Sequence, residues 1–185
     1  MPYAVELRFD EDLAERVRGL WRALEAIGAS SFGAGGAPVP HLSLAVYDHE
    51  DEVDEAAARD LVAKLAARVA PVNIAVASLG VFPTEESVLF LAPVVTPALL
   101  DLHARYHAVA KSLGATCRPY YLPGCWVPHC TLSMQGPMAG VQDALGHLAA
   151  SWSPLRGTIR TVALIKVPPL LTLAEQALAG ESRPR

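Results

Sequence analysis

Apolar and polar residues follow regular patterns along most of the chain, and these patterns predict a series of strands and helices. Residues 3–9 alternate, with a large apolar side chain at every second position, which is typical of a β-strand with one buried face. After Asp10, apolar residues recur at helical spacing from Leu13 to Ile27. Asp10 can cap this helix and Gly28 can end it.

The same reasoning divides the rest of the chain. It predicts strands over residues 41–47, 72–82, 87–95, 116–122, 127–132 and 157–167, and helices over residues 48–69, 97–113 and 138–152. Residues 30–38 are expected to form a flexible glycine-rich connector, and residues 170–185 a weak helix and a loose tail. Each half then reads strand, helix, strand, helix, strand. This order predicts one two-lobed α+β domain over residues 1–185, with an internal repeat of about 1–82 and 87–167.

A six-residue motif, Val-Pro-His-x-(Ser or Thr)-Leu, occurs at residues 39–44 and again at 127–132, 88 positions later. In a strand, residues i and i+2 share a face and lie ~7 Å apart, so the histidine and the hydroxyl residue of each copy point to the same side. These pairs are His41 with Ser43, and His129 with Thr131. The intervening apolar residues face a core. Two copies at half-chain spacing predict pseudo-symmetric lobes whose polar sides meet at a cleft.

Two imidazoles facing each other suit an in-line displacement at phosphorus. A neutral ring takes a proton from the attacking oxygen and a protonated ring gives one to the leaving oxygen, and both forms exist near neutrality because the reference pKa of histidine is about 6.5. The hydroxyls of Ser43 and Thr131 can hold the non-bridging phosphate oxygens. Tyr47 lies an even number of residues after His41 and is expected on the cleft face as well. Which histidine is the acid is not encoded in the motif.

A histidine beside a proline at the start of a strand can also be structural, bonded to a backbone carbonyl. The matched hydroxyl two residues later in both copies favours the catalytic interpretation.

Composition and charge limit the possible partners. With 52% hydrophobic and 18% charged residues, the chain is expected to fold as a soluble protein. No apolar run is long enough to span a bilayer and residues 1–8 do not resemble a signal peptide, so we expect a cytoplasmic protein without a membrane partner. Residues 1–92 carry a net charge of −8 and residues 93–185 carry +4. This balance disfavours a long nucleic acid and favours a small phosphate-bearing substrate.

Three cysteines, Cys117, Cys125 and Cys130, lack CxxC spacing and are expected to be reduced thiols. Together with His103 and His107, which stand at i and i+4 on a helix, they suggest an alternative, a zinc-dependent hydrolase. No carboxylate separates the two histidines at metalloprotease spacing. A partly exposed helix face is therefore the preferred explanation of this histidine pair, and no metal site is expected.

The paired motifs resemble those of the two-histidine phosphoesterase superfamily, and most closely its 2′-5′ RNA ligase-like and cyclic phosphodiesterase members. The approach to the second motif, Pro123-Gly124-Cys125-Trp126-Val127-Pro128-His129-Cys130-Thr131-Leu132, carries this resemblance especially. Ser43 stands where threonine is commoner in that family. The resemblance implies two antiparallel sheets with the motif strands at the cleft and the helices outside. It also implies a cofactor-independent enzyme that opens ribose 2′,3′-cyclic phosphates or related cyclic or 2′-5′ phosphodiesters.

Aromatic residues near the motifs could stack on a nucleobase, which gives ~1–3 kcal/mol per base. Trp126 is the first candidate, followed by Tyr120, Tyr121 and Tyr3. The expected substrate is a small nucleotide or an RNA-end phosphate, and we expect a monomer. Two further alternatives stay open: a non-catalytic nucleotide or RNA-end binding module with the same fold, and a 2′-5′ RNA ligase.

Overall fold

The computed structural model describes residues 3–29, 39–48, 53–134 and 138–180. Its strands are β1 (Tyr3–Phe9), β2 (His41–Tyr47), β3 (Val72–Phe82), β4 (Val88–Pro93), β5 (Cys130–Ser133), β6 (Leu155–Lys166) and β7 (Leu171–Ala177). Its α-helices are α1 (Glu11–Ala26), α2 (Glu55–Ala66), α3 (Pro97–Ala110) and α4 (Met138–Ala149). The predicted connector, residues 30–38, lies outside the described residues.

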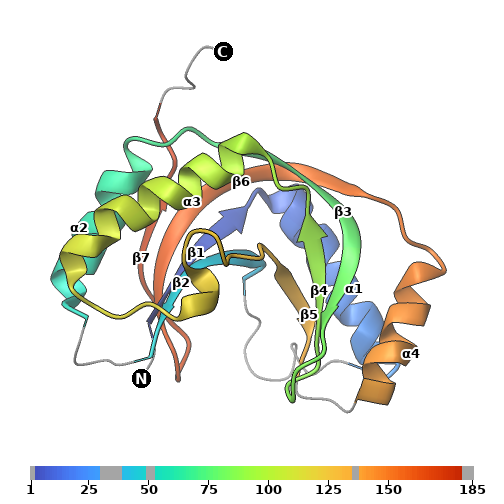
Figure 1. The fold of residues 1–185 in the computed structure, drawn as a ribbon. Helices are drawn as coiled ribbons and strands as arrows, with labels where there is room; N and C mark the ends of the chain where they lie inside the picture. Colours follow the sequence, from blue (N-terminus) through green and yellow to red (C-terminus); the bar gives the residue numbers. More distant parts are fainter. Residues whose placement is uncertain (1–2, 30–38, 49–52, 135–137, 181–185) are drawn as a thin grey trace.

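The strands form an antiparallel sheet in the order β2-β1-β6-β3-β4-β5, with β7 paired to β6. The predicted α+β class with antiparallel strands is therefore confirmed. The two sheets expected for the two lobes are continuous, because the long strand β6 pairs with both β1 and β3. The sheet bends into an arch (Figure 1).

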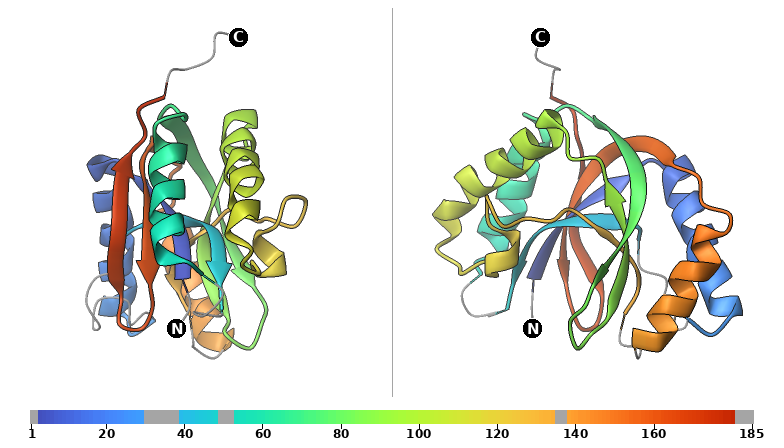
Figure 2. Two further views of the ribbon diagram at one scale, coloured as in Figure 1. Left: turned by 90° about the vertical axis from the view of Figure 1, so that its left-hand side faces the viewer. Right: turned by 45° about the vertical axis from the view of Figure 1, so that its right-hand side comes forward.

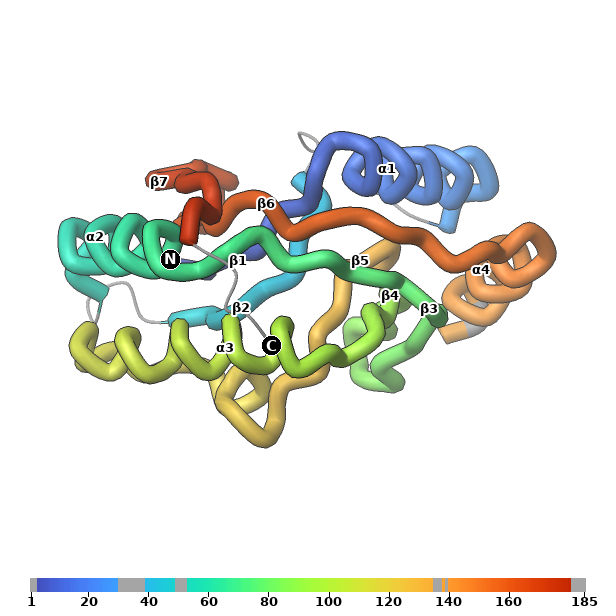
Figure 3. The backbone as a smooth tube through the Cα atoms, turned by 90° about the horizontal axis from the view of Figure 1, so that it is seen from above, coloured from blue at the N-terminus to red at the C-terminus, as the bar shows by residue number. Residues whose placement is uncertain are grey.

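The helices lie at the two ends of this arch. Helix α2 packs against β6, β7 and α3, whereas α1 packs against β5 and β6, and α4 packs against β4. Figures 2 and 3 show α2 and α3 at one end of the molecule and α1 and α4 at the other. Each lobe therefore takes elements from both halves of the sequence, and the repeat boundaries at residues 82 and 87 stay a prediction.

The two motif strands, β2 and β5, are the two ends of the strand order. The bend of the sheet brings these edges together. The thiol of Cys130 is hydrogen-bonded with the backbone of His41. Nε1 of Trp126 donates to the carbonyl of Ser43 at 3.0 Å, and Nε1 of Trp21 donates to the carbonyl of Thr131 at 3.0 Å. Indole donors thus occupy backbone carbonyls of both edge strands. The bonds of Trp126 and Cys130 join the two motif segments, whereas that of Trp21 joins helix α1 to β5.

Helix α1 begins as its sequence predicts. The side chain of Asp10 accepts a hydrogen bond from the backbone N–H of Leu13 at 2.9 Å. One stripe of the helix is buried against the sheet: Leu13, Ala14, Val17, Trp21 and Leu24. Trp21 belongs to this stripe, which is how it reaches β5.

A bulge changes the predicted orientation of Tyr47. The register of β1 and β2 shifts between the pairs Val5–Ala45 and Glu6–Ser43, so Leu44 is an additional residue in β2. After Leu44, the residues of β2 that face the core occupy the opposite positions in the alternation. Tyr47 is consequently buried in the core, with its hydroxyl 2.7 Å from the hydroxyl of Tyr106, and its expected place on the cleft face was wrong.

The strand predicted at residues 116–122 and, within the described residues, the weak helix and loose tail predicted from residue 170 onward were also wrong. Residues 116–122 are not a strand, because Pro119 lacks an N–H group and the segment forms a 3₁₀ turn at Pro119–Tyr121. This segment is tied to the end of β2 by the ion pair of Arg118 with Asp48.

Residues 170–180 are not a helix or a loose tail. Residues 171–177 form β7, which pairs along β6, and Leu178 is buried behind it. Hydrogen bonds along the edge of β6 determine this conformation, and single-sequence periodicity does not reveal them.

Candidate active site

His41 is the first residue of β2 and His129 immediately precedes β5, and both histidines are half-buried. Nδ1 of His41 lies 2.7 Å from the carbonyl oxygen of Val39, and Nδ1 of His129 lies 2.8 Å from that of Val127. A carbonyl oxygen only accepts hydrogen bonds, so Nδ1 carries a proton in both rings. The identical contact fixes both rings in one orientation and leaves each Nε2 for chemistry.

The surroundings of His129 are aromatic. Its ring is edge-on to the ring of Phe82, with the two centroids 4.9 Å apart. The centroid of the Phe90 ring lies 5.4 Å from that of His129. Burial lowers the pKa of His129, and the charge of His41 lowers it further, whereas the hydrogen bond to the Val127 carbonyl raises it. The described residues give its Nε2 no hydrogen-bond partner. His129 is therefore predominantly neutral near pH 7, with a lone pair on Nε2.

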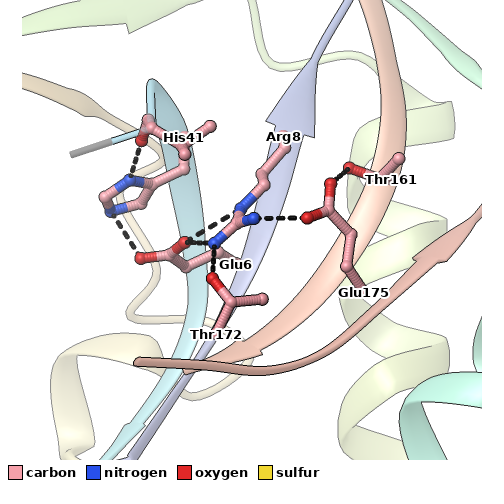
Figure 4. A network of polar contacts seen from close by, with 7 residues as sticks. Glu6, Arg8, His41, Thr161, Thr172 and Glu175 are labelled. Carbon is pink, nitrogen blue, oxygen red and sulfur yellow. Dashed lines mark hydrogen bonds and ion pairs between the residues drawn. The ribbon is translucent and has the colours of Figure 1, made fainter. Parts of the chain in front are cut away.

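The surroundings of His41 are charged. Its Nε2 lies 3.3 Å from Oε1 of Glu6 (Figure 4). Nδ1 faces a carbonyl and Nε2 faces a carboxylate, so both ring nitrogens face acceptors. Nδ1 donates to the carbonyl, and a proton on Nε2 would point toward the carboxylate, in contrast to the aromatic surroundings of His129.

Glu6 is held in place by Arg8. Both residues are buried, and their side chains lie 3.3 Å apart. Arg8 also contacts two residues of β7: its Nη1 lies 2.6 Å from Oε2 of Glu175, and its Nη2 donates to the hydroxyl of Thr172 at 3.0 Å. A network of polar contacts thus runs from His41 across β1 to β7 (Figure 4).

The two hydroxyl residues are paired with chemically different neighbours. Ser43 lies opposite Glu6 in the β1–β2 ladder, and Thr131 lies opposite Phe90 in the β4–β5 ladder. The hydroxyl of Tyr121 is hydrogen-bonded with the side chain of Ser43. Both motif hydroxyls are half-buried beside their histidines.

The predicted base-stacking residues have different environments. Tyr3 is 3% exposed on the core face of β1, where its hydroxyl contacts Glu55, so its predicted role was wrong. Tyr120 is exposed to solvent. Trp126 stacks on His103, with ring centroids 4.1 Å apart, so one face of its indole is occupied. Stacking of a base by Tyr120, or by the other face of Trp126, stays a prediction.

His103 and His107 do not occupy an exposed helix face, and that explanation was wrong. Both are buried, and their Nε2 atoms contact the carbonyls of Tyr121 at 2.8 Å and Leu44 at 3.2 Å. Burial lowers the pKa of His103 to about 4 and also lowers that of His107. The sequence contained this signal, because both histidines fall within the apolar stripe of α3: Leu99, Leu102, Tyr106 and Ala110.

The zinc alternative needs these histidines and the cysteines to converge. Among the residues that the structure describes, no group of three or more histidine, cysteine or acidic side chains is arranged to hold a metal ion. The Nε2 atoms of His103 and His107 are already hydrogen-bonded to backbone carbonyls.

Sequence reasoning missed four residues of the site: Glu6, Arg8, Phe82 and Phe90. The first two lie in a strand whose other face is fully apolar, and charged residues in such a strand are an available signal. Their contact with His41 depends on the pairing of β1 with β2, which the sequence does not specify.

An antiparallel sheet that brings two histidine–hydroxyl motifs together at its edges defines the class of two-histidine phosphoesterases. The family model of the 2′-5′ RNA ligase superfamily matches residues 9–168, and the chain belongs to this superfamily. The predicted family resemblance is therefore confirmed. Members of this superfamily have phosphoesterase or ligase-type activity. No curated protein matches the chain.

Solved structures share the fold. TT0787 of Thermus thermophilus is 21% identical, with a TM-score of 0.63 over 98% of this chain and 100% of that one. LigT of Escherichia coli in complex with 3′-AMP is 16% identical, with a TM-score of 0.60 over 96% and 99% of the two chains. Usb1 of Kluyveromyces marxianus is 12% identical, with a TM-score of 0.50 over 93% and 97%.

Within the described part of the chain, none of the helices has the length and apolar character needed to cross a membrane.

Proposed function

We propose that this protein is a metal-independent phosphoesterase that opens ribose 2′,3′-cyclic phosphates or related cyclic or 2′-5′ phosphodiesters. Three observations carry the proposal: the identical Nδ1–carbonyl contacts of the two motif histidines, their different Nε2 surroundings, and the charge interaction between the two rings. One ring is suited to accept a proton and the other to donate one. These are the two requirements of in-line hydrolysis at phosphorus.

The contacts favour different roles for the two rings. His129, in an aromatic setting with a lowered pKa, is the general base. His41, with acceptors at both nitrogens, is the general acid. The His41–Glu6 distance of 3.3 Å exceeds the ~2.7–2.9 Å of a short charge-assisted hydrogen bond, so Glu6 lies near Nε2 without a short bond that would oppose proton transfer. The ring is 29% exposed, which allows a leaving oxygen to approach it.

The chemical step balances with one water molecule. Nε2 of His129 takes a proton from the water as its oxygen forms a bond to phosphorus. The bond from phosphorus to one ribose oxygen breaks, and Nε2 of His41 gives its proton to that oxygen. The product is a phosphate monoester with a free ribose hydroxyl. Proton exchange with solvent then restores a neutral His129 and a protonated His41. In this proposal the hydroxyls of Ser43 and Thr131, which are half-buried beside the two histidines, donate to the non-bridging oxygens.

A small nucleotide substrate is proposed because a protein with a similar fold binds small ligands of this kind. LigT of E. coli has been solved with 3′-AMP and with phosphate. The net charge of −4 disfavours a long RNA partner. A cytoplasmic location and a monomeric state remain sequence-based expectations.

The proposal is tested by incubating the protein with 2′,3′-cyclic nucleotides, 3′,5′-cyclic nucleotides and 2′-5′-linked dinucleotides in excess chelator, and following the phosphorus by NMR. We expect 2′,3′-cyclic phosphates to open to monoesters. Binding without turnover for the whole panel would favour the non-catalytic module, and activity that chelator abolishes would favour a metal-dependent hydrolase. Joining of RNA ends without hydrolysis would favour the ligase.

A further inference from the structure

His41, Glu6, Arg8 and Glu175 form a row of alternating charge across three strands. Successive members are separated by 3.3 Å, 3.3 Å and 2.6 Å (Figure 4). The row contains two carboxylates and one guanidinium, so it is neutral only when His41 is protonated. The C-terminal strand β7 supplies its last member.

The interior of this row is shielded from water. The side chains of Glu6 and Arg8 are 4% and 7% exposed, whereas that of Glu175 is 43% exposed. Charges in such a setting interact more strongly than surface pairs because less solvent screens them. Arg8 therefore links two carboxylates, that of Glu6 beside His41 and that of Glu175 nearer the surface.

We propose that Glu6 and Glu175 are positioning residues for His41: Glu6 contacts the ring directly, Glu175 acts through Arg8, and the two carboxylates orient the ring and favour proton donation from its Nε2. The catalytic part of this inference rests on the proposed function, whereas the charge coupling itself does not. Neither carboxylate is assigned a contact with substrate.

The other groups facing His41 do not supply this effect. His129, which immediately precedes β5, carries a like charge when protonated and opposes a positive His41. Cys130 lies against the His41 backbone, and burial raises the pKa of its thiol to about 12, so it is neutral. Arg8 on β1 is a cation and opposes the protonated ring as well. The carboxylates of Glu6 and Glu175 are the groups on these elements that favour it.

Loss of either carboxylate acts in the same direction. Glu6→Gln keeps the size of the side chain and removes the charge beside Nε2. Glu175→Gln leaves Arg8 with one carboxylate instead of two, which adds net positive charge near His41 and draws Glu6 toward Arg8. Both changes weaken the support of the imidazolium ring.

The test follows the ring resonances of His41 by ¹³C and ¹⁵N NMR during a pH titration without substrate. We expect Glu6→Gln to lower the proton affinity of His41 about tenfold or more, and Glu175→Gln to lower it on the order of threefold. Glu55→Gln is the matched control, since Glu55 on α2 has a 40% exposed side chain and an ion pair with Arg59. We expect Glu55→Gln to leave the His41 titration unchanged.

A merely structural network would lower the melting temperature of both variants without moving the His41 titration, and that result would overturn the inference. Because Glu175 is half-exposed, Glu175→Gln keeps the test valid even if Glu6→Gln does not fold. The alkaline limb of kcat/KM for a 2′,3′-cyclic nucleotide should move to lower pH in the same order as the ring titrations. Shifted titrations in a protein that opens no cyclic phosphate would refute the proposed function and leave the coupling standing.

Discussion

Oε1 of Glu6 lies 3.3 Å from Nε2 of His41, and no equivalent carboxylate is recorded beside His129 in the described part of the chain. The difference arises from the strands next to the two motifs. The residue opposite Ser43 is Glu6, whereas the residue opposite Thr131 is Phe90. The first motif thus lies beside a strand that contributes a carboxylate, and the second lies beside a strand that contributes an aromatic ring. This asymmetry separates the roles of the histidines, which the motifs alone leave equivalent.

The pH dependence of turnover should report the aromatic setting of His129. Since burial lowers its pKa below the ordinary value of about 6.5, its neutral form persists below that pH, and kcat/KM should fall on acidification only at lower pH. Phe82→Ala should hydrate the ring, raise its pKa and move the acidic limb of the pH profile to higher pH. An acidic limb that stays in place in this variant would argue against desolvation as the cause.

Gly80 gives Phe90 its position beside His129. A Cβ at residue 80 would lie 2.4 Å from two atoms of the Phe90 ring. Gly80→Ala should therefore displace that ring, destabilise the protein by about 1–3 kcal/mol and lower kcat. Denaturant unfolding and turnover of a 2′,3′-cyclic nucleotide measure the two effects.

Gly146 provides the matched control for this change, since a Cβ there meets no atom within 4 Å and the residue lies in helix α4. Gly146→Ala should leave turnover unchanged and add roughly 0.5–1 kcal/mol of stability. Equal loss of turnover in both variants would refute the account of Gly80.

Trp126 has a contact that distinguishes positioning from base stacking. Its Nε1 donates to the carbonyl of Ser43, on the first motif strand. Trp126→Phe keeps an aromatic face and removes this donor, so kcat should fall several-fold with little change in KM. A large rise in KM that depends on the nucleobase, with kcat preserved, would instead identify Trp126 as the stacking residue.

The buried histidines of α3 should make folding stability depend on pH. The folded-state pKa of His103, about 4, lies below its unfolded value, so the unfolded chain binds more protons as the pH falls from about 6.5 to 4. This stabilising contribution is complete above pH 6.5 and is lost on acidification. It should amount to about 2 kcal/mol between pH 8 and pH 5, and His107 adds in the same direction.

His103→Gln should reduce this dependence, because glutamine does not titrate and its amide can still donate to the Tyr121 carbonyl. Urea unfolding at the two pH values measures the effect. An unchanged difference between pH 8 and pH 5 in the variant would show that His103 is not its source.

Local pattern was sufficient for much of the fold. The cap at Asp10, the alternation of residues 3–9 and the stop at Gly28 are short-range signals, and the structure contains the corresponding elements. The repeated motif also indicated which side chains share a face, because strand geometry fixes the i, i+2 relationship over the few residues before the bulge.

Contacts between distant strands could not be predicted in this way. One additional residue at Leu44 reversed the alternation and buried Tyr47. The position of β7 depends on pairing with β6, and the neighbour of His41 depends on the pairing of β1 with β2. Periodicity in a single sequence specifies which residues are apolar, but it does not specify which strands are partners or in what register they pair.

The most direct test of the account is the kcat/KM for opening a 2′,3′-cyclic nucleotide, measured in excess chelator for the wild type, His41→Asn and His129→Asn. We expect the wild type to turn over, and each folded variant to lose about 100-fold or more, since each removes one proton transfer. A variant that keeps more than a tenth of the wild-type value would contradict the pairing of the two imidazoles at one phosphorus atom, as would a wild type that opens no cyclic phosphate.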